Sequence, residues 1–277
     1  MSKKIIALFA DPVAHSFSPR MHTYGFQTWN IDAEYLLVQS TPETLQKDFQ
    51  KLEAQYGEQF IGANFSFPNK KAMLTLADIK DSTVQRVGAG NTIVKEQGLW
   101  KAYNTDGKGF FLALKEKGYE LKGKTLTLLG SGSAAISIIE QAPFFGITNI
   151  YVYYTKESYY QNTKEKLDFL QKETPFSYQL LPYTSQDFRK EKTDFFVNTT
   201  ADSLLRRKRD SLQYPDALIL DLNYVPKCST FLKEAKAQGK ETMNGLGMLV
   251  FQGALAFEKW CHHPLPTKEI WPMLEEK

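Results

Sequence analysis

Short apolar runs alternate with more polar, helix-like segments along most of the chain. The apolar runs predict strands at residues 4–10, 34–39, 60–65, 91–95 and 99–102, and again at 124–129, 149–154, 177–181, 194–198 and 217–222. Two further helices are expected near the end of the chain, at about 246–260 and 267–275. Strands that alternate with helices are typical of largely parallel sheets covered by helices on both faces. We therefore expect an α/β fold.

A second start of this pattern divides the chain into two parts. Residues 124–133 have the pattern of the first strand, turn and helix of a nucleotide-binding unit, which places a boundary near Tyr103. The length of 277 residues is sufficient for two domains. The pattern leaves open whether the C-terminal helices form a third layer on the second domain or return to the first.

Composition and charge narrow the class of protein. Apolar residues make up 42% and aromatic residues 13%, which excludes a mainly disordered chain. The net charge of +3 is too small to indicate a nucleic-acid partner, and no run approaches the ~20 apolar residues of a membrane-spanning helix. Two cysteines exclude a disulfide scaffold, and the adjacent His262 and His263 lack carboxylates at a metal-ligating spacing. We expect a cytoplasmic protein that binds a small molecule and has no metal, membrane or nucleic-acid site.

The strand at 124–129 ends in a turn that indicates a dinucleotide. Gly130 and Gly132 flank Ser131, and Ser133 and Ala134 begin a helix of small residues. Such a turn lets the backbone approach a pyrophosphate, and the helix N-terminus supplies free amides. The third glycine of the full pattern is missing, so a plain turn between a strand and a helix remains the alternative.

The end of the next strand bears on the choice of cofactor. An NAD site usually carries Asp or Glu here and an NADP site Arg nearby, whereas this strand ends at Tyr154. Lys156 could meet a 2′-phosphate as a point charge, or be a solvated surface lysine. The basic run at residues 206–209 is most simply an exposed loop; a contact with cofactor phosphates or with RNA is the alternative.

Polar residues also follow the strands of the first half. The Ser16 and Ser18 hydroxyls could hold a carboxylate or a polyol, and Lys70 could donate a proton, with Asp106 as its partner. Each residue alone has a plainer interpretation, with Ser18 as the N-cap of a helix, Lys70 as a solvated lysine and Asp106 as part of a helix cap.

Taken in order, these segments resemble the motifs of the shikimate dehydrogenase family. The family's turn His-Ser-x-Ser-Pro is present at 15–19, and residues 64–70 resemble Asn-Val-Thr-x-Pro-x-Lys. Gly-Ala-x-Asn-Thr and Asn-Thr-Asp-Gly are intact at 88–92 and 104–107, and Gly-x-x-Met-Leu-x-x-Gln-Gly-Ala at 245–254. The stretch 221–226 also fits, so the resemblance spans about residues 4–262.

The resemblance implies a fold and an activity. Residues 1–103 with 244–277 would form the shikimate-binding catalytic domain, and residues 104–243 a Rossmann-type NADP-binding domain. The activity would be the reversible NADPH-dependent reduction of 3-dehydroshikimate to shikimate, in chorismate and aromatic amino acid biosynthesis. The protein would be a monomer or a homodimer.

The resemblance also assigns roles to residues. Lys70 would be the general acid and base, paired with Asp106, and Ser16 and Ser18 would hold the substrate carboxylate. The rest of the substrate site would be Asn64, Ser66, Asn91, Tyr224 and Gln252. The cofactor would be bound by Gly130, Ser131, Gly132, Ser133 and Ala134 at its pyrophosphate, and further by Thr155, Lys156, Leu222 and Gly245.

One departure from the family pattern keeps other functions open. The family usually has Asn-Arg-Thr after the second Rossmann strand, and the matching residues here are Tyr153, Tyr154 and Thr155. Loss of the arginine removes a bidentate phosphate donor, so NAD is possible beside NADP. A paralogue that uses NAD or acts on quinate or another cyclic hydroxy acid is therefore the main alternative. A non-catalytic binding protein of the same fold is a weaker one.

Overall fold

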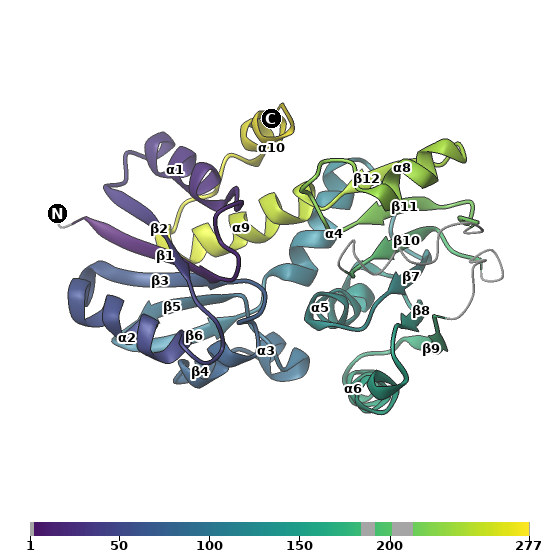
Figure 1. Cartoon of the computed structure of the whole chain (residues 1–277), viewed down its shortest axis with the longest axis horizontal. Coiled ribbons are helices and arrows are strands. Elements are labelled where there is room, and N and C mark those ends of the chain that lie inside the picture. The colour runs from purple at the N-terminus through teal and green to yellow at the C-terminus, as the bar shows by residue number, and fades with distance from the viewer. Residues whose placement is uncertain (1–2, 184–191, 201–212, 277) are drawn as a thin grey trace. The chain divides into compact units, whose positions relative to one another are not determined.

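The computed structural model describes residues 3–183, 192–200 and 213–276. The chain divides into two compact units, Met1–Gly109 with Leu249–Lys277, and Phe110–Met248. Each unit holds one six-stranded sheet, coloured purple to blue in the first and green in the second (Figure 1). The α/β fold predicted from the sequence is confirmed. The predicted division at 103 and 243 lies close to these limits, and its assignment of one function to each domain stays a prediction.

The sheet of the first unit is mixed, which corrects the expectation of a largely parallel sheet here. The strand order is β2-β1-β3-β5-β6-β4. β1 pairs parallel with both neighbours, whereas β5 is antiparallel to β3 and β6. Gln97 and Gly98, both at positive φ, form the tight turn between β5 and β6, and such a two-residue connection joins antiparallel strands. The bounds are β1 Lys4–Ala10, β2 Ala33–Gln39, β3 Phe60–Phe65, β4 Ile79–Lys80, β5 Thr92–Glu96 and β6 Leu99–Tyr103.

Helices cover both faces of this sheet (Figure 1). Because side chains alternate along a strand, Phe9 of β1 faces α2 and packs against Phe49, with ring centres 5.8 Å apart. On the other face, the rings of His22 of α1 and Trp260 of α9 pack edge to face, with their centres 5.4 Å apart. The helical segments are α1 Ser18–Thr28, α2 Leu45–Tyr56, η1 Gly57–Gln59, η2 Ala72–Thr75, α3 Ser82–Val87, α4 Asp106–Glu116, α9 Leu246–Cys261 and α10 Thr267–Glu275, of which α4 and α9 contain the limits between the units.

The sheet of the second unit is parallel throughout, in the order β12-β11-β10-β7-β8-β9. The direction of winding reverses between β7 and β10, and in such sheets ligands bind at the carboxyl ends of the strands at that point. The strands are β7 Thr125–Leu129, β8 Asn149–Tyr154, β9 Ser177–Pro182, β10 Phe195–Asn198, β11 Leu218–Asp221 and β12 Thr242–Asn244. The helical segments are α5 Ser133–Gln141, η3 Ala142–Phe145, η4 Glu157–Tyr159, α6 Tyr160–Glu173 and α8 Thr230–Ala237.

Two searches of the described residues bear on the class of protein. None of their helices combines the length and the apolar character that a membrane span requires. Nor do they contain a group of three or more His, Cys, Asp or Glu residues arranged to hold a metal ion.

Candidate active site

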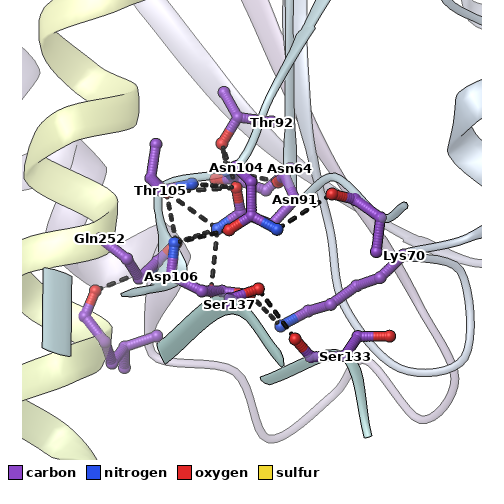
Figure 2. A network of polar contacts seen from close by, with 12 residues as sticks. Asn64, Lys70, Asn91, Thr92, Asn104, Thr105, Asp106, Ser133, Ser137 and Gln252 are labelled. Carbon is purple, nitrogen blue, oxygen red and sulfur yellow. Dashed lines mark hydrogen bonds and ion pairs between the residues drawn. The ribbon is translucent and has the colours of Figure 1, made fainter. Parts of the chain in front are cut away.

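The centre of the candidate site is an ion pair between Lys70 and Asp106 (Figure 2). Lys70 follows β3, Asp106 is the first residue of α4, and the Lys70 Nζ lies 2.6 Å from Asp106 Oδ2. The Asp106 side chain is only 4% exposed and that of Lys70 21%. The ammonium is therefore held by a buried carboxylate while part of the lysine side chain still reaches solvent.

Asn91, just before β5, holds the other oxygen of this carboxylate. Its Nδ2 donates to Asp106 Oδ1 at 2.9 Å and also faces Gln252 Oε1 at 3.0 Å. Its Oδ1 accepts from the backbone N–H of Thr105 at 2.9 Å. Both oxygens of Asp106 are engaged, one by Lys70 and one by Asn91, so the orientation of the carboxylate is fixed (Figure 2).

The backbone of the turn that carries Lys70 is also fixed. The Asn69 N–H donates to the Ser66 carbonyl at 2.7 Å, and Asn69 Nδ2 donates to the carbonyl of Ser40 at 2.7 Å. The Gly90 N–H donates to the Lys70 carbonyl at 2.9 Å. A Cβ at Gly90 would lie 2.6 Å from the sulfur of Met73, so a larger residue here would force the Met73 side chain to shift.

The structure places Asn64 behind this centre. Its Oδ1 accepts from the Tyr35 hydroxyl at 2.7 Å, and its Nδ2 donates to the Asn91 carbonyl and to Thr92 Oγ1, both at 3.1 Å. Both ends of the amide are engaged within the protein and the residue is buried. Asn64 therefore holds Asn91 in place, and a direct contact with substrate stays a prediction.

Ser16 and Ser18 lie together where β1 leads into α1. Ser16 Oγ accepts from the Ser18 N–H at 3.2 Å. The N-cap position is Phe17, whose side chain makes no capping bond, so the expected N-cap at Ser18 is wrong by one residue. The Ser18 side chain is buried, whereas Ser16 and Ser66, which follows β3, are partly exposed.

Gln252 reaches the centre because α4 and α9 pack closely. A Cβ at Gly109 would lie 2.5 Å from the backbone nitrogen of Gln252, so the contact needs glycine on α4. The Gln252 Oε1 meets Asn91, and its Nε2 donates to the Leu249 carbonyl at 2.8 Å. The predicted substrate residue Tyr224 belongs to the second unit, on the turn after β11, and is partly exposed.

In the second unit, the glycine turn after β7 has the form of an anion cradle. Gly130 has φ +105°, and a Cβ there would lie 2.5 Å from Thr199 Oγ1 of the turn after β10. α5 begins after Gly132 with no side-chain cap among the described residues, and a Cβ at Gly132 would meet nothing within 4 Å. The first amides of a helix lack intrahelical acceptors, and an uncapped N-terminus with open space at Gly132 fits a pyrophosphate. Ser131, Ser133 and Ala134 of this turn are partly exposed.

The end of β8 carries a tyrosine that is tied to a carboxylate. The hydroxyl of Tyr154, only 7% exposed, donates to Glu157 Oε2 at 3.0 Å. Burial and then this carboxylate raise the pKa of the Tyr154 hydroxyl above its usual value, so it remains a donor. Thr155 is partly exposed, and the exposed Lys156 has its Nζ 5.6 Å from the centre of the Tyr159 ring. The basic run at 206–209 lies outside the described residues.

Two polar residues to which the sequence analysis assigned no role lie at the ends of β10 and β11. Asn198 and Asp221 end these strands, both are fully buried, and Asn198 Nδ2 donates to Asp221 Oδ1 at 3.1 Å. The available signal was their position, because polar residues that end neighbouring parallel strands meet at one edge of a sheet. The predicted cofactor residues Leu222 and Gly245 lie beside them, and a Cβ at Gly245 would lie 1.9 Å from the Leu222 carbonyl oxygen.

Comparisons with known proteins agree with this arrangement. A sequence model described as the shikimate dehydrogenase substrate binding domain matches residues 8–93, and one described as the shikimate 5'-dehydrogenase C-terminal domain matches residues 245–272. The shikimate dehydrogenase (NADP(+)) of Streptococcus sanguinis is 34% identical over 99% of this chain and 96% of its own.

Solved structures of similar proteins share the fold over nearly the whole chain. Shikimate 5-dehydrogenase of Listeria monocytogenes, crystallised with shikimate and NAD, superposes with a TM-score of 0.83 at 31% identity, over 98% of this chain and 96% of its own. The ligand-free 5-ketofructose reductase of a Gluconobacter strain also has a TM-score of 0.83, at 26% identity, over 100% of this chain and 99% of its own. The fold is thus shared by proteins named for different polyol substrates.

Proposed function

The chain belongs to the shikimate dehydrogenase family, and we propose that it catalyses the reversible NADP-dependent reduction of 3-dehydroshikimate to shikimate. The observation that carries the proposal is the Lys70–Asp106 pair, which Asn91 and Gln252 surround in the same unit. Through this reaction the protein would serve chorismate and aromatic amino acid biosynthesis. The relative from Streptococcus sanguinis, which matches nearly the whole chain, is named shikimate dehydrogenase (NADP(+)).

Lys70 is the proton donor in this proposal. Reduction of a ketone places negative charge on its oxygen, and a nearby ammonium stabilises that charge and delivers the proton. The Lys70 side chain is 21% exposed, so water can return the proton after each turnover. In the reverse direction the neutral amine accepts the proton of the reacting hydroxyl.

Asp106 has two tasks. One oxygen, 2.6 Å from Nζ, orients Lys70, and the other is aligned by Asn91 at 2.9 Å. Each carboxylate oxygen has two acceptor positions, so Asp106 can also accept a hydrogen bond from a ring hydroxyl of the substrate. The Ser16 and Ser18 hydroxyls would hold the substrate carboxylate, and Ser66 and Tyr224 would complete the polyol site.

The second unit supports the choice of a dinucleotide cofactor. NADPH supplies the hydride when bound, and the protein supplies its orientation. The uncapped N-terminus of α5 and the open space at Gly132 suit the pyrophosphate. Leu222 and Gly245 would lie near the nicotinamide, and Thr155 and Lys156 near the 2′-phosphate.

A steady-state assay of the purified protein tests the proposal. Shikimate and quinate are each offered with NADP and with NAD, while the absorbance of the reduced cofactor is followed; 5-ketofructose with NADPH serves as a polyol ketone without a carboxylate. We expect turnover of shikimate with NADP, lost in Lys70→Ala and kept in Lys71→Ala. Lys71 is the matched control because it is the next residue, carries the same charge and is exposed.

The same assay separates the alternatives. Turnover only with NAD, or only with quinate, would assign the chain to a paralogue, which the tyrosine at position 154 favours because it removes the usual phosphate-binding arginine. Reduction of 5-ketofructose alone would mean that Ser16 and Ser18 do not select for a carboxylate. No turnover by a folded protein would leave a binding role without catalysis.

A further inference from the structure

Asp221, at the end of β11, is a buried charge that the proposed reaction does not use. It is fully buried and accepts from Asn198 Nδ2 at 3.1 Å, from the Asn223 N–H at 3.0 Å and from Asn223 Nδ2 at 2.8 Å. The hydroxyl of Ser229 is a further donor. Burial of a carboxylate is costly unless several donors compensate it, and this one has four. We call Asn198, Asp221, Asn223 and Ser229 the Asp221 network.

The network fastens the turn after β10 to the turn after β11. Asn198 Oδ1 accepts from the Thr200 N–H at 3.0 Å and from Thr200 Oγ1 at 2.7 Å. The Leu222 N–H donates to the Asn198 carbonyl at 3.0 Å, and Asn223 Nδ2 donates to the Thr200 carbonyl at 2.9 Å. Removal of the Asp221 carboxylate would take an acceptor from the buried Asn198 amide and from the Asn223 N–H, and loss of an acceptor is the costly outcome for a polar donor.

Both flanks of these joined turns touch predicted cofactor residues. On one side the Thr199 N–H and hydroxyl both donate to the Leu129 carbonyl at 2.9 Å, directly before Gly130. On the other side the Gly245 N–H approaches the Asn223 carbonyl at 3.3 Å. The network therefore connects the carboxyl ends of β7, β10, β11 and β12, the edge at which this sheet type binds its ligand.

We propose that Asp221 is a positioning residue for dinucleotide binding, because its carboxylate holds the turns that carry Thr199, Leu222 and Gly245. The inference rests on the proposed function only in taking these turns as the cofactor site. A purely structural role is the competing explanation, since Ser229 is the N-cap of α8 and accepts from the Leu232 N–H at 3.3 Å. The two explanations differ in what happens to the cofactor.

Titration of NADPH in the absence of substrate tests the proposal. Isothermal calorimetry gives the dissociation constant without any turnover, and urea unfolding gives the stability of each variant. We expect Asp221→Ala to weaken NADPH binding about tenfold, because donors in both turns lose their acceptor. Asp221→Asn keeps one oxygen for Asn198 and Asn223, and we expect it to recover most of the affinity.

Asp194→Ala is the matched control for a loss of stability. Asp194 precedes β10 at the opposite edge of the same sheet, where it accepts from the Thr125 N–H at 2.8 Å and Lys124 Nζ at 3.2 Å. Asp194→Ala removes a hydrogen-bonded aspartate from the same unit and leaves the Asp221 network intact. We expect it to lower stability and to leave the NADPH dissociation constant within about twofold of that of the unaltered protein.

The outcomes are distinguishable. An unchanged dissociation constant in folded Asp221→Ala overturns the proposal, as does an equal weakening in Asp194→Ala at equal stability. If Asp221→Ala does not fold, Asn223→Ala cuts the link to the Thr200 carbonyl and takes its place with the same criteria. The unaltered protein decides the proposed function separately, since NADPH binding without shikimate turnover would refute that function and still report on Asp221. If it binds only NADH, the same titrations are run with NADH.

Discussion

Replacement of Lys70 by alanine is the most direct test of the catalytic assignment, because two of its consequences differ in size. The first is a loss of stability. Asp106, with a 4% exposed side chain, would keep Asn91 Nδ2 as its one side-chain donor among the described residues. Loss of a hydrogen bond to a charged group costs about 1.5–3 kcal/mol, and the partial exposure of Lys70 points to about 2 kcal/mol.

The second consequence is a loss of turnover. A positioned general acid contributes about 10²–10⁴ in rate, and the lost ammonium also stabilises charge on the oxygen. We expect kcat to fall about 10³-fold, which corresponds to about 4 kcal/mol in the activation barrier. A Lys70→Ala protein that remains folded should therefore be almost inactive, although its free energy of unfolding falls by only about 2 kcal/mol.

Arginine at position 70 separates the two consequences. A guanidinium restores the ion pair with Asp106 but does not give up a proton. We expect Lys70→Arg to recover most of the stability in urea unfolding while kcat for shikimate stays about 10²-fold or more below that of the unaltered protein. Recovery of turnover together with stability, or more than a tenth of the original kcat in Lys70→Ala, would refute the role of Lys70 as the proton donor.

Two further predictions address the packing around this centre and the core of the first unit. Gly109→Ala would place a Cβ 2.5 Å from the backbone nitrogen of Gln252, so the KM for shikimate should rise about tenfold. Lys108→Ala, at the exposed neighbouring position, should leave this KM unchanged. If steady-state kinetics gave Gly109→Ala the same KM as the unaltered protein, Gln252 would be excluded from the substrate site. Burial lowers the pKa of His22 to about 3, so the folded ring stays neutral where the unfolded ring, near 6.5, takes up a proton. Stability should therefore be complete above pH 6.5 and fall by about 2 kcal/mol from this residue by pH 5. His22→Phe should reduce the difference between urea unfolding at pH 7 and pH 5 by that amount, and an unchanged difference would contradict the burial argument.

The sequence predicts the buried strands well for a simple physical reason. The predicted bounds of β1, β3 and β8 agree with the structure, because a strand buried on both faces is a short, nearly continuous apolar run. The edge strands β4 and β12 were missed, since each has only two or three residues and is at least partly exposed. The two-residue turn at Gln97 and Gly98 could have predicted that β5 and β6 are antiparallel, but we expected a largely parallel sheet.

Helix starts were less predictable, because capping depends on tertiary context. The spacing of Ser40 and Glu43 predicts a capping box, yet α2 begins at Leu45 after Thr44. The Ser40 hydroxyl instead contacts Thr44 Oγ1 at 3.2 Å, and its carbonyl accepts from Asn69 Nδ2. The Ser40 hydroxyl is thus engaged by a residue of the turn before α2, while the Ser40 carbonyl binds the turn that bears Lys70.

The candidate site could be predicted where it depends on strand ends and not where it depends on side-chain orientation. Lys70 and Asp106 both follow strands of one sheet, so a pair between residues 36 positions apart was a reasonable expectation, and the structure forms it. The Asp221 network needs side chains from two strand ends and a helix cap to point inward together. No periodicity or spacing records that orientation, and Asp221 therefore had no assigned role.

The end of β8 shows how one substitution changes the physics of cofactor choice. The residues from Tyr151 to Tyr160 include no arginine, and Tyr154 fills the position while holding Glu157 at 3.0 Å. Recognition of a 2′-phosphate here would rest on the exposed Lys156, which acts as a single point charge. An exposed charge pair is screened by salt, since the Debye length shrinks from about 10 Å at 0.1 M to 3 Å at 1 M, whereas binding of NAD involves no such pair. We therefore expect the KM for NADP to rise with salt several-fold more than the KM for NAD, and Lys156→Ala to abolish this difference. Equal salt dependence for the two cofactors, or a difference that persists in Lys156→Ala, would mean that the 2′-phosphate is bound elsewhere.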